Sequence, residues 1–406
     1  MLGSARSSFP TQILAEGKLI SKPLEMAKAV NKFFLDKIIK LKENSPADHT
    51  NATDALESYL QEKTLPEEGF KLKELEDVDV IKLAKKLKGK KSCGVDWICG
   101  FSLKIVAKDL LPELKILINL SIRNNRFTKQ WKFSKILLAF KNKGTRFDLK
   151  NYRPLSNLPE VSKLAERAVY DQLYGYLEKN SLIHPNHHGY LRNCSTSTAL
   201  QQMYDVWLQA LDEGKMAAVL FLDLSAGFDV VNHQILLKKL AKYNFSIETL
   251  QWFESYLLNR RQAVQVESAL SPPLPVPYGV PQGSILGPLL FLLYVNELPD
   301  VIKVKNDDES KLDEEAEVVV YADDTTSSTS DPNPEVLQQK IQSHAEILPN
   351  WFEKNDLVVS GEKTKMMVVA TSANRAQNIT ASGLSFNIDV CKKSVKGTES
   401  EKLQVL

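Results

Sequence analysis

The sequence is poor in cysteine, and its few cysteines follow no recognisable pattern. Cys93, Cys99, Cys194 and Cys391 form no Cys-x-x-Cys pair and have no regular spacing. This argues against a disulfide framework and against a zinc knuckle. The first ten residues also lack the apolar core of a signal peptide. We therefore expect reduced thiols in an intracellular protein, in either the nucleus or the cytoplasm.

Long apolar runs and a strong net charge are missing as well. No uninterrupted apolar run reaches the roughly 18 residues that a membrane-spanning helix needs. The longest apolar-rich stretch, Ile285 to Val295, contains Gly287 and Pro288 and is predicted to be a buried core helix. The formal net charge is +2. No membrane partner is expected, and a nucleic-acid partner would have to be held by local basic patches.

The chain itself is long and globular in composition. Its 406 residues, 43% apolar and 25% charged, suffice for two or three domains or one multi-lobed domain. The N-terminal part has helical periodicity at Leu24 to Leu41 and Leu72 to Leu87, separated by a polar linker over Lys42 to Asp54. The second of these helices ends in a lysine-rich run, Lys82 to Lys91. That run is either a solvated helix face or a nucleic-acid contact.

The remaining periodicity predicts a mixed, α+β chain. Helices are expected over residues 101–122, 160–179, 196–211, 231–243, 250–258 and 334–354, and strands over 136–140, 216–224, 263–266 and part of 357–370. Met216 to Leu224 is nearly all apolar, which is typical of a strand covered on both faces.

The segment from Glu317 to Thr329 predicts a β-hairpin with two aspartates at its tip. Val318 to Tyr321 has the β-branched composition of a strand, and a Thr/Ser run follows Asp323 and Asp324. Adjacent carboxylates repel each other, and a bound divalent cation is the usual compensation. Asp-Asp is also ordinary turn chemistry, and chance supplies such a string in about one chain in ten of this length.

Asp223 is the candidate third carboxylate. It ends the buried strand predicted at Met216 to Leu224, and a helix N-cap or a surface turn is the alternative explanation. If this strand pairs with the hairpin, three carboxylates meet at one rim. Such a group can hold two Mg²⁺ ions about 3.5–4 Å apart, one at an attacking oxygen and one at a leaving phosphate.

Three stretches now carry a family resemblance. These are Leu222-Asp223-Leu224-Ser225-Ala226-Gly227-Phe228-Asp229, Gly279-Val280-Pro281-Gln282-Gly283-Ser284 and Tyr321-Ala322-Asp323-Asp324. In order and spacing they resemble polymerase motifs of reverse transcriptases from non-LTR (LINE-type) retrotransposons. The resemblance extends over roughly residues 90 to 375 and includes Lys91 to Asp96, Asn151 to Ser156, His188 to Arg192 and Lys363 to Lys365.

The resemblance implies an RNA-directed DNA polymerase with an RNA template, a DNA primer and dNTPs as partners. Asp223, Asp323 and Asp324 would bind two Mg²⁺ ions, or Mn²⁺, with the Leu224 carbonyl as an auxiliary ligand. Phe228 would exclude ribonucleotides through a clash at the sugar 2′ position. Gln282 and Gly283 would line the pocket for the template and the incoming nucleotide.

Basic residues complete the implied site. Arg153, and Lys141 or Lys143, would neutralise the triphosphate, since Arg suits bidentate phosphate contacts. Lys363 would protonate the leaving pyrophosphate or, alternatively, is a solvated turn lysine. The sequence departs from the family pattern at Gly227, where Ala is usual, and in an acidic segment, 306–317.

The implied fold is a right-hand polymerase of fingers and palm with a helical N-terminal extension. We expect the extension over residues 1–90, fingers and upstream helices over 91–215, the catalytic palm over 216–375 and the beginning of the thumb region over 376–406, with the thumb largely missing. Oligomeric state is left open.

Two rival functions remain. One is a catalytically inactive retrotransposon-derived fragment that binds nucleic acid through Lys82 to Lys91. The other is a different two-metal phosphoryl-transfer enzyme, such as a nuclease or a nucleotide cyclase. Separately, His184, His187 and His188 with Cys194 invite a metal interpretation, but the segment is more typical of a loop. Four tryptophans are expected in the core or in interfaces, namely Trp131, Trp207, Trp252 and Trp351.

Overall fold

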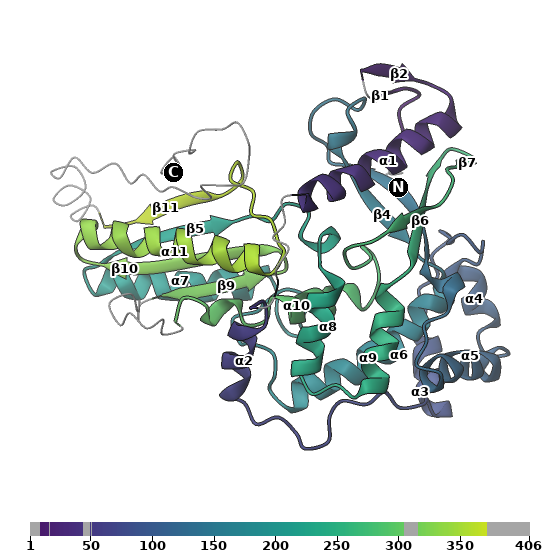
Figure 1. The fold of residues 1–406 in the computed structure, drawn as a ribbon, viewed down its shortest axis with the longest axis horizontal. Coiled ribbons are helices and arrows are strands. Elements are labelled where there is room, and N and C mark those ends of the chain that lie inside the picture. Colours follow the sequence, from purple (N-terminus) through teal and green to yellow (C-terminus); the bar gives the residue numbers. More distant parts are fainter. Residues whose placement is uncertain (1–8, 16, 44–48, 50, 304–315, 372–406) are drawn as a thin grey trace, which may run out of the picture. The chain divides into compact units, whose positions relative to one another are not determined.

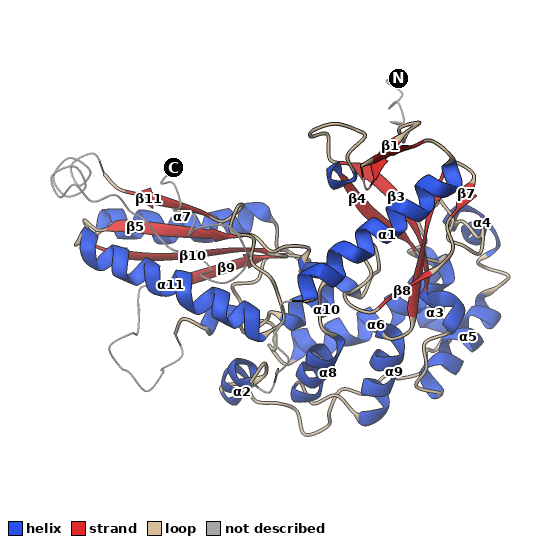
Figure 2. Ribbon diagram, turned by 45° about the horizontal axis from the view of Figure 1, so that its top comes forward, coloured by secondary structure: helices blue, strands red, loops and turns tan. Residues whose placement is uncertain are grey.

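The computed structural model describes residues 9–15, 17–43, 49, 51–303 and 316–371, drawn in colour in Figure 1. The chain divides into two units. The first unit comprises residues 1–41, 70–174 and 245–287, and the second comprises 42–69, 175–244 and 288–406. Both combine sheets with helices, which confirms the predicted α+β class (Figure 2). Most of the acidic segment 306–317, and Cys391, lie outside the described residues.

The first unit is built on a five-stranded sheet of order β4-β3-β6-β7, with β8 also paired to β6. Its strands are β3 (Phe133–Phe140), β4 (Tyr152–Asn157), β6 (Arg260–Val266), β7 (Ala269–Leu270) and β8 (Leu274–Val276). Helix α1 (Pro23–Lys42) lies across this sheet, where Met26, Val30 and Phe34 pack against Ile136 and Val264 (Figure 1). A short pair, β1 (Ile13–Ala15) and β2 (Lys18–Ile20), adds strands to the N-terminal part predicted as helical.

The helices of the first unit surround an aromatic cluster. They are α3 (Asp77–Lys85), α4 (Gly100–Val106), α5 (Leu111–Arg123), α6 (Glu160–Lys179), whose last turn enters the second unit, and α9 (Ile247–Leu257), with short η1 (Lys129–Lys132) and η2 (Leu149–Asn151). The ring of Phe127 lies 5.3 Å from Trp131, 5.4 Å from Trp252 and 5.0 Å from Tyr256, centroid to centroid. Trp131 and Trp252 are thus core residues, as predicted.

Two predicted helices differ from the structure. The helix expected over 101–122 is two helices, α4 and α5, and Pro112 stands in the first turn of α5, where its missing N–H leaves no helical hydrogen bond unmade. The helix expected from Leu72 begins only at Asp77. The N–H groups of Leu72 and Leu75 are taken instead by the side chains of Thr249 and Asn119, which holds this stretch extended.

The second unit is a four-stranded antiparallel sheet between two long helices. The strand order is β11-β5-β10-β9, made of β5 (Met216–Leu222), β9 (Glu317–Tyr321), β10 (Asp324–Asp331) and β11 (Lys365–Val369). Helix α7 (Thr196–Asp212) covers one face and α11 (Pro334–Lys354) the other, as both ribbon views show. Strand β5 is accordingly buried on both faces, which confirms the prediction.

Shorter helices complete the second unit. They are α2 (Asp54–Gln61), η3 (Gly227–Asp229), α8 (His233–Lys242), α10 (Gly287–Tyr294), which begins at the end of the first unit, and η4 (Leu298–Asp300). Helix α10 is the predicted buried core helix, with Phe291 1% exposed and Leu290 fully buried. Within the described part of the chain, no helix is both long and apolar enough to cross a membrane.

Candidate active site

The predicted hairpin is present, with Asp323 and Asp324 at its tip. Strand β9 ends at Tyr321 and β10 begins at Asp324, and these two residues pair with each other. The turn consists of Ala322 and Asp323, and Ala322 adopts a left-handed φ of 60°. An alanine pays about 1–2 kcal/mol in this region, and such strain is concentrated at functional sites.

Asp223 lies at the same end of the sheet as the hairpin tip. Strands β5 and β10 are antiparallel, with Leu222 opposite Thr325. One step further along this register sets Asp223 opposite Asp324. The turn that follows β5 also contacts the tip, because a Cβ on Gly227 would lie 3.4 Å from the Cβ of Asp323. The three carboxylates are therefore gathered at one rim, as the sequence predicted.

The proximity of the three carboxylates affects the pKa of Asp324. Partial burial, and then the negative charges of Asp323 and Asp223, raise the pKa of the Asp324 carboxyl, while Lys363 lowers it. Carboxylates that disfavour one another's ionisation are suited to a cation that relieves the repulsion.

Lys363 provides one such positive charge. Strands β11 and β5 pair Lys365 with Phe221, and Lys363 lies in the turn that leads into β11. Its Nζ lies 2.7 Å from Oδ1 of Asp223. The backbone is tied here as well, since the Ser360 N–H donates to the Asp223 carbonyl at 2.8 Å and Leu224 pairs with Val359.

The donor chemistry of the rim fits a hard divalent cation, because three carboxylates and a backbone carbonyl are all oxygen ligands. Over the described ranges, however, no three His, Cys, Asp or Glu side chains are already arranged as a ligand set. Oδ1 of Asp223 is engaged by the Lys363 ammonium at 2.7 Å, so a cation bound by Asp223 would compete with that lysine.

Phe228 lies in η3, five residues after Asp223, and belongs to an aromatic group of the second unit. Its ring is stacked on that of Phe291, with centroids 4.3 Å apart and planes at 22°. The ring of Tyr190 meets it at 85° and 5.9 Å. The ring predicted to face a sugar is thus held by two other rings.

Gly227, beside it, has an ordinary φ, and an added Cβ would lie 3.3 Å from the Leu224 side chain. The alanine usual in the family would require the Leu224 side chain to move by a few tenths of an ångström.

The remaining candidates lie in the first unit. Arg153 of β4 pairs with Ala139 of β3. Just past the end of β3, the Lys141 N–H donates to the Asn151 carbonyl. By strand alternation Lys141 and Arg153 lie on one face of this hairpin. Both side chains are exposed, as is that of Lys143. The Lys141 ammonium donates to the Lys150 carbonyl at 2.7 Å.

Gln282 and Gly283 lie against the same hairpin. The Ser156 N–H of β4 donates to the Gln282 carbonyl at 3.2 Å. Gly283 has a φ of +94°, and a Cβ there would lie 2.8 Å from the Ser156 carbonyl oxygen. Only glycine meets both conditions. Ser284 then accepts the Gly287 N–H at the start of α10, close to the helix start that was predicted.

Glu166, which was not predicted from the sequence, holds the end of the loop that contains Gln282 and Gly283. Its Oε2 accepts the N–H groups of Ile285 at 2.8 Å and Leu286 at 3.3 Å. The carboxyl is fully buried, and burial raises its pKa while the nearby Arg260 charge lowers it. The sequence signal for this residue was its helical spacing with Val169 and Leu173, which places a glutamate on an apolar helix face. In the structure both of these apolar residues are fully buried.

The histidine cluster is structural. His184 bonds to Asp300 at 3.2 Å, His187 to the Asn296 carbonyl at 3.1 Å, and His188 to Thr198 and Gln202 at 2.9 and 2.7 Å. These contacts account for the rings without a metal. The three cysteines in the described ranges are free thiols, as predicted.

Four of the five tryptophans are buried, and the fifth is exposed. Trp131, Trp207, Trp252 and Trp351 are at most 7% exposed, which confirms the prediction for all four. Trp97, which was not considered, is 73% exposed, and its ring faces the Lys135 ammonium at 4.9 Å.

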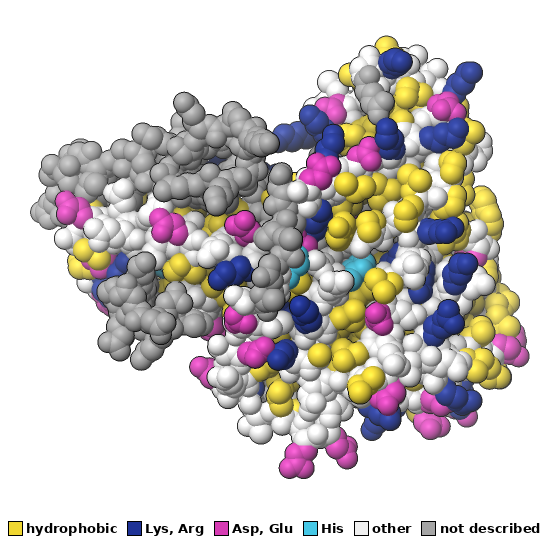
Figure 3. Space-filling model, viewed as in Figure 1, with side chains coloured by type: hydrophobic (Ala, Val, Ile, Leu, Met, Phe, Trp, Pro, Cys, Tyr) yellow, Lys and Arg dark blue, Asp and Glu magenta, His cyan; other side chains and the backbone are white. Residues whose placement is uncertain are grey.

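The lysine run is exposed, but parts of it are paired. The side chains of Lys82, Lys85, Lys86, Lys88, Lys90 and Lys91 are all exposed. Lys86 pairs with Asp171 at 2.7 Å and Lys82 with Asp79 at 3.9 Å. On the face drawn in Figure 3, basic and acidic side chains are interspersed.

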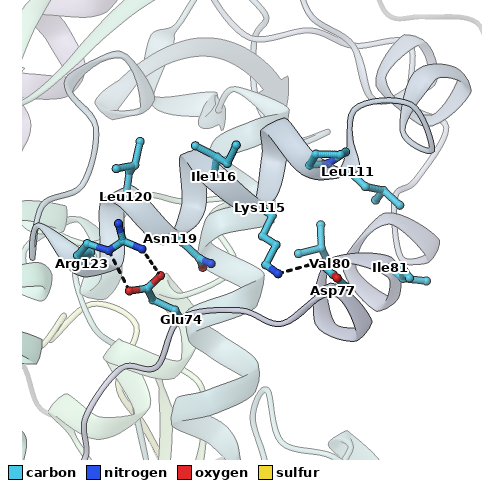
Figure 4. Close-up of a pocket in the computed structure, with 11 residues that line it drawn as sticks. Glu74, Asp77, Val80, Ile81, Leu111, Lys115, Ile116, Asn119, Leu120 and Arg123 are labelled. Carbon is cyan, nitrogen blue, oxygen red and sulfur yellow. Dashed lines mark hydrogen bonds and ion pairs between the residues drawn. The ribbon is translucent and has the colours of Figure 1, made fainter.

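A groove of about 680 Å³ lies between α3 and α5 of the first unit (Figure 4). Ion pairs of 2.7 Å cross it, one joining Arg123 to Glu74 and one joining Lys115 to Asp77. Its lining includes none of the predicted site residues.

Comparison with known proteins agrees with these features. The family described as "Reverse transcriptase (RNA-dependent DNA polymerase)" matches residues 140–399, more than half of the chain. The chain therefore belongs to the reverse transcriptase family. Within that family it is a reverse transcriptase domain of the LINE type, from a non-LTR retrotransposon.

Two Drosophila melanogaster relatives illustrate this. The "Probable RNA-directed DNA polymerase from transposon BS" is 30% identical over 311 residues, covering 77% of this chain and 33% of the relative. The "RNA-directed DNA polymerase from mobile element jockey" is 27% identical over 331 residues, covering 81% and 35%. The chain thus spans about a third of the length of these curated relatives.

Proposed function

We propose that this chain catalyses RNA-directed DNA synthesis, adding dNTPs to the 3′-hydroxyl of a DNA primer on an RNA template. The observation that carries the proposal is the gathering of Asp223, Asp323 and Asp324 at one end of the second unit's sheet. Acids in such a group serve phosphoryl transfer by orienting reactants and balancing charge. A nuclease or a cyclase would leave the Gly279 to Gly283 loop and Arg153 without a purpose.

Asp223, Asp323 and Asp324, with the Leu224 carbonyl, are the proposed ligands of two Mg²⁺ ions, for which Mn²⁺ is an alternative. When bound, these ions would supply activation of the primer hydroxyl and charge neutralisation at the leaving pyrophosphate. The raised pKa of Asp324 is consistent with this role, because partial burial first, and then the charges of Asp323 and Asp223, disfavour its ionised form.

The other site residues are proposed to bind and orient the nucleotide. Lys141 and Arg153, exposed on one face of the β3–β4 hairpin, would neutralise the triphosphate. Gln282 and Gly283 would line the pocket for the template and the incoming base. Phe228 would exclude a 2′-hydroxyl by steric clash. Lys363 would hold a proton for the pyrophosphate, and its present contact with Asp223 keeps its ammonium at the rim.

The finer architecture is proposed as a right-hand polymerase. The second unit's sheet, with α7 and α11 on its faces, corresponds to the palm, and the β3–β4 hairpin belongs to the fingers. The boundaries proposed from the sequence are 1–90 for the extension, 91–215 for the fingers region and 216–375 for the palm. Two changes are proposed from the units: α7 is grouped with the palm sheet that it covers, and residues 245–287 are grouped with the first unit.

Primer extension tests this function. The protein is incubated with an annealed RNA template and DNA primer, dNTPs and Mg²⁺, and the products are resolved by length. Asp323→Asn should abolish extension, whereas the matched Asp212→Asn should not, since Asp212 is exposed at the opposite end of β5. Extension by Asp323→Asn at the wild-type rate would overturn the assignment.

The second candidate function is an inactive fragment that binds nucleic acid. It is favoured by one observation, the exposure of Lys88, Lys90 and Lys91 beyond α3. RNA binding that weakens with salt, at a log–log slope of about −0.7 per phosphate contacted, together with no dNTP incorporation, would select this alternative.

A further inference from the structure

Tyr190 belongs to a loop that is fastened to the hairpin carrying Asp323 and Asp324. The loop runs beside the edge strand β9, where the Val320 N–H donates to the Asn186 carbonyl at 3.0 Å and the His188 N–H donates to the Val320 carbonyl at 2.9 Å. The His188 ring is in turn bonded to Thr198 and Gln202 of α7. Tyr190 therefore follows a segment whose position is set by both the sheet and a helix.

The loop touches the hairpin turn directly. A Cβ on Gly189 would lie 2.3 Å from the Ala322 backbone nitrogen, so no residue with a side chain fits there without moving the backbone. Tyr190 comes next, in a left-handed conformation with φ of 61°. For a bulky residue this is a true outlier, and such residues cluster where geometry serves function.

The Tyr190 ring packs against Phe228. The two rings are nearly perpendicular, at 85°, with centroids 5.9 Å apart. One face of the Phe228 ring is stacked on the ring of the buried Phe291. A stacked neighbour and a perpendicular neighbour together restrict the orientations open to the Phe228 ring.

Tyr190 also faces the acidic tip, although it is 52% exposed. Burial of the hydroxyl, and then the charges of Asp323, Tyr321 and Asp324, raise its pKa. The hydroxyl thus stays protonated and neutral beside the carboxylates.

We propose that Tyr190 is a positioning residue that fixes the Phe228 ring and thereby sets the discrimination between dNTPs and rNTPs. This rests on the proposed polymerase function. The ring of Tyr190 acts on the nucleotide through Phe228, because a side chain that is free to rotate yields to a 2′-hydroxyl, whereas a clamped ring does not. The strained backbone of Tyr190 and the glycine before it are explained by this task.

Single-nucleotide incorporation measures the effect. The kcat/KM for a dNTP and for the matching rNTP is determined with wild-type protein, Tyr190→Ala, Tyr190→Phe and Phe228→Ala. Tyr204→Ala is the matched control, since Tyr204 is also exposed, at 56%, and its ring lies 5.6 Å from Trp207 on the same helix, α7. The ratio within one preparation is independent of how much of the protein is folded.

Tyr190→Ala should lower the dNTP preference about 2- to 12-fold, the change equivalent to an aromatic pair worth 0.5–1.5 kcal/mol. Tyr190→Phe and Tyr204→Ala should keep the wild-type ratio. Adding Tyr190→Ala to Phe228→Ala should lower the preference no further, because the ring to be positioned is gone.

Three outcomes overturn the inference. The first is an unchanged ratio in Tyr190→Ala when the wild type is active, which leaves the polymerase function standing. The second is an equal loss in Tyr190→Phe, which would assign the effect to the hydroxyl. The third is wild-type protein that incorporates neither nucleotide, which removes the proposed function and this inference together.

Discussion

Lys363 Nζ lies 2.7 Å from Oδ1 of Asp223, so a lysine 140 residues away in sequence neutralises one of the three rim carboxylates. The pair is partly exposed, with side-chain exposures of 61% and 34%. An exposed pair of this kind is worth only about 0.2–1 kcal/mol. It is thus a weak contact that a stronger competitor for the carboxylate displaces.

Removing the lysine should therefore strengthen the binding of cations at the rim. In Lys363→Met, the Mg²⁺ concentration for half-maximal primer extension should fall, by no more than about fivefold for a pair of this strength. The maximal rate should fall as well if Lys363 protonates pyrophosphate. A Mg²⁺ titration of extension rate separates the two effects, and Lys354→Met, on the exposed end of α11, serves as the control. A half-maximal concentration that rises in Lys363→Met would contradict the competition.

The raised pKa of Asp324 predicts a gain in stability when its charge is removed. A carboxyl whose pKa is higher in the folded than in the unfolded state favours folding below the unfolded value, about 3.9, and loses that contribution as pH rises through the folded value. The Asp324→Asn variant should therefore have a higher Tm than the wild type at pH 7 and a similar Tm near pH 3. The same substitution should abolish primer extension. Thermal melts across this pH range provide the measurement, and an equal Tm difference at both ends would refute the electrostatic explanation.

Glu166 is expected to matter for stability and for the loop it anchors. In Glu166→Ala the N–H groups of Ile285 and Leu286 lose their acceptor, at about 1–3 kcal/mol for each donor left unpaired. Urea unfolding should show this loss. Glu113→Ala, an exposed position on α5, should stay within about 0.5 kcal/mol of wild type. Equal stabilities for the two variants would show that the carboxylate is dispensable.

Two glycines offer a matched test of backbone requirements. Gly283→Ala places a Cβ 2.8 Å from the Ser156 carbonyl at a φ of +94° and should lower both stability and extension. Gly175→Ala, within helix α6 and with no atom near the new Cβ, should raise the free energy of unfolding by about 0.5–1 kcal/mol. The denaturant midpoints of the two variants should move in opposite directions, and a shift in the same direction would argue against the special role of Gly283.

Much of the fold could be predicted from local pattern. Helices α6 and α11 have the predicted limits because each carries an uninterrupted apolar stripe between helix-starting and helix-ending signals. The break between α4 and α5 was missed because the apolar periodicity continues from one helix into the next. The signal that marks the break is Pro112, in the first turn of α5, and the prediction gave it too little weight.

The sequence by itself determined the hairpin, the buried strand before Asp223 and the family to which the chain belongs, because each depends on residues adjacent along the chain. Only the tertiary structure decided that Lys363 faces Asp223, that Glu166 is buried beneath the Gln282–Gly283 loop and that Tyr190 meets Phe228. These contacts follow from packing between segments far apart in sequence. No local propensity encodes such pairings, because Glu166 lies on a helix and Lys363 and Tyr190 lie in connecting segments.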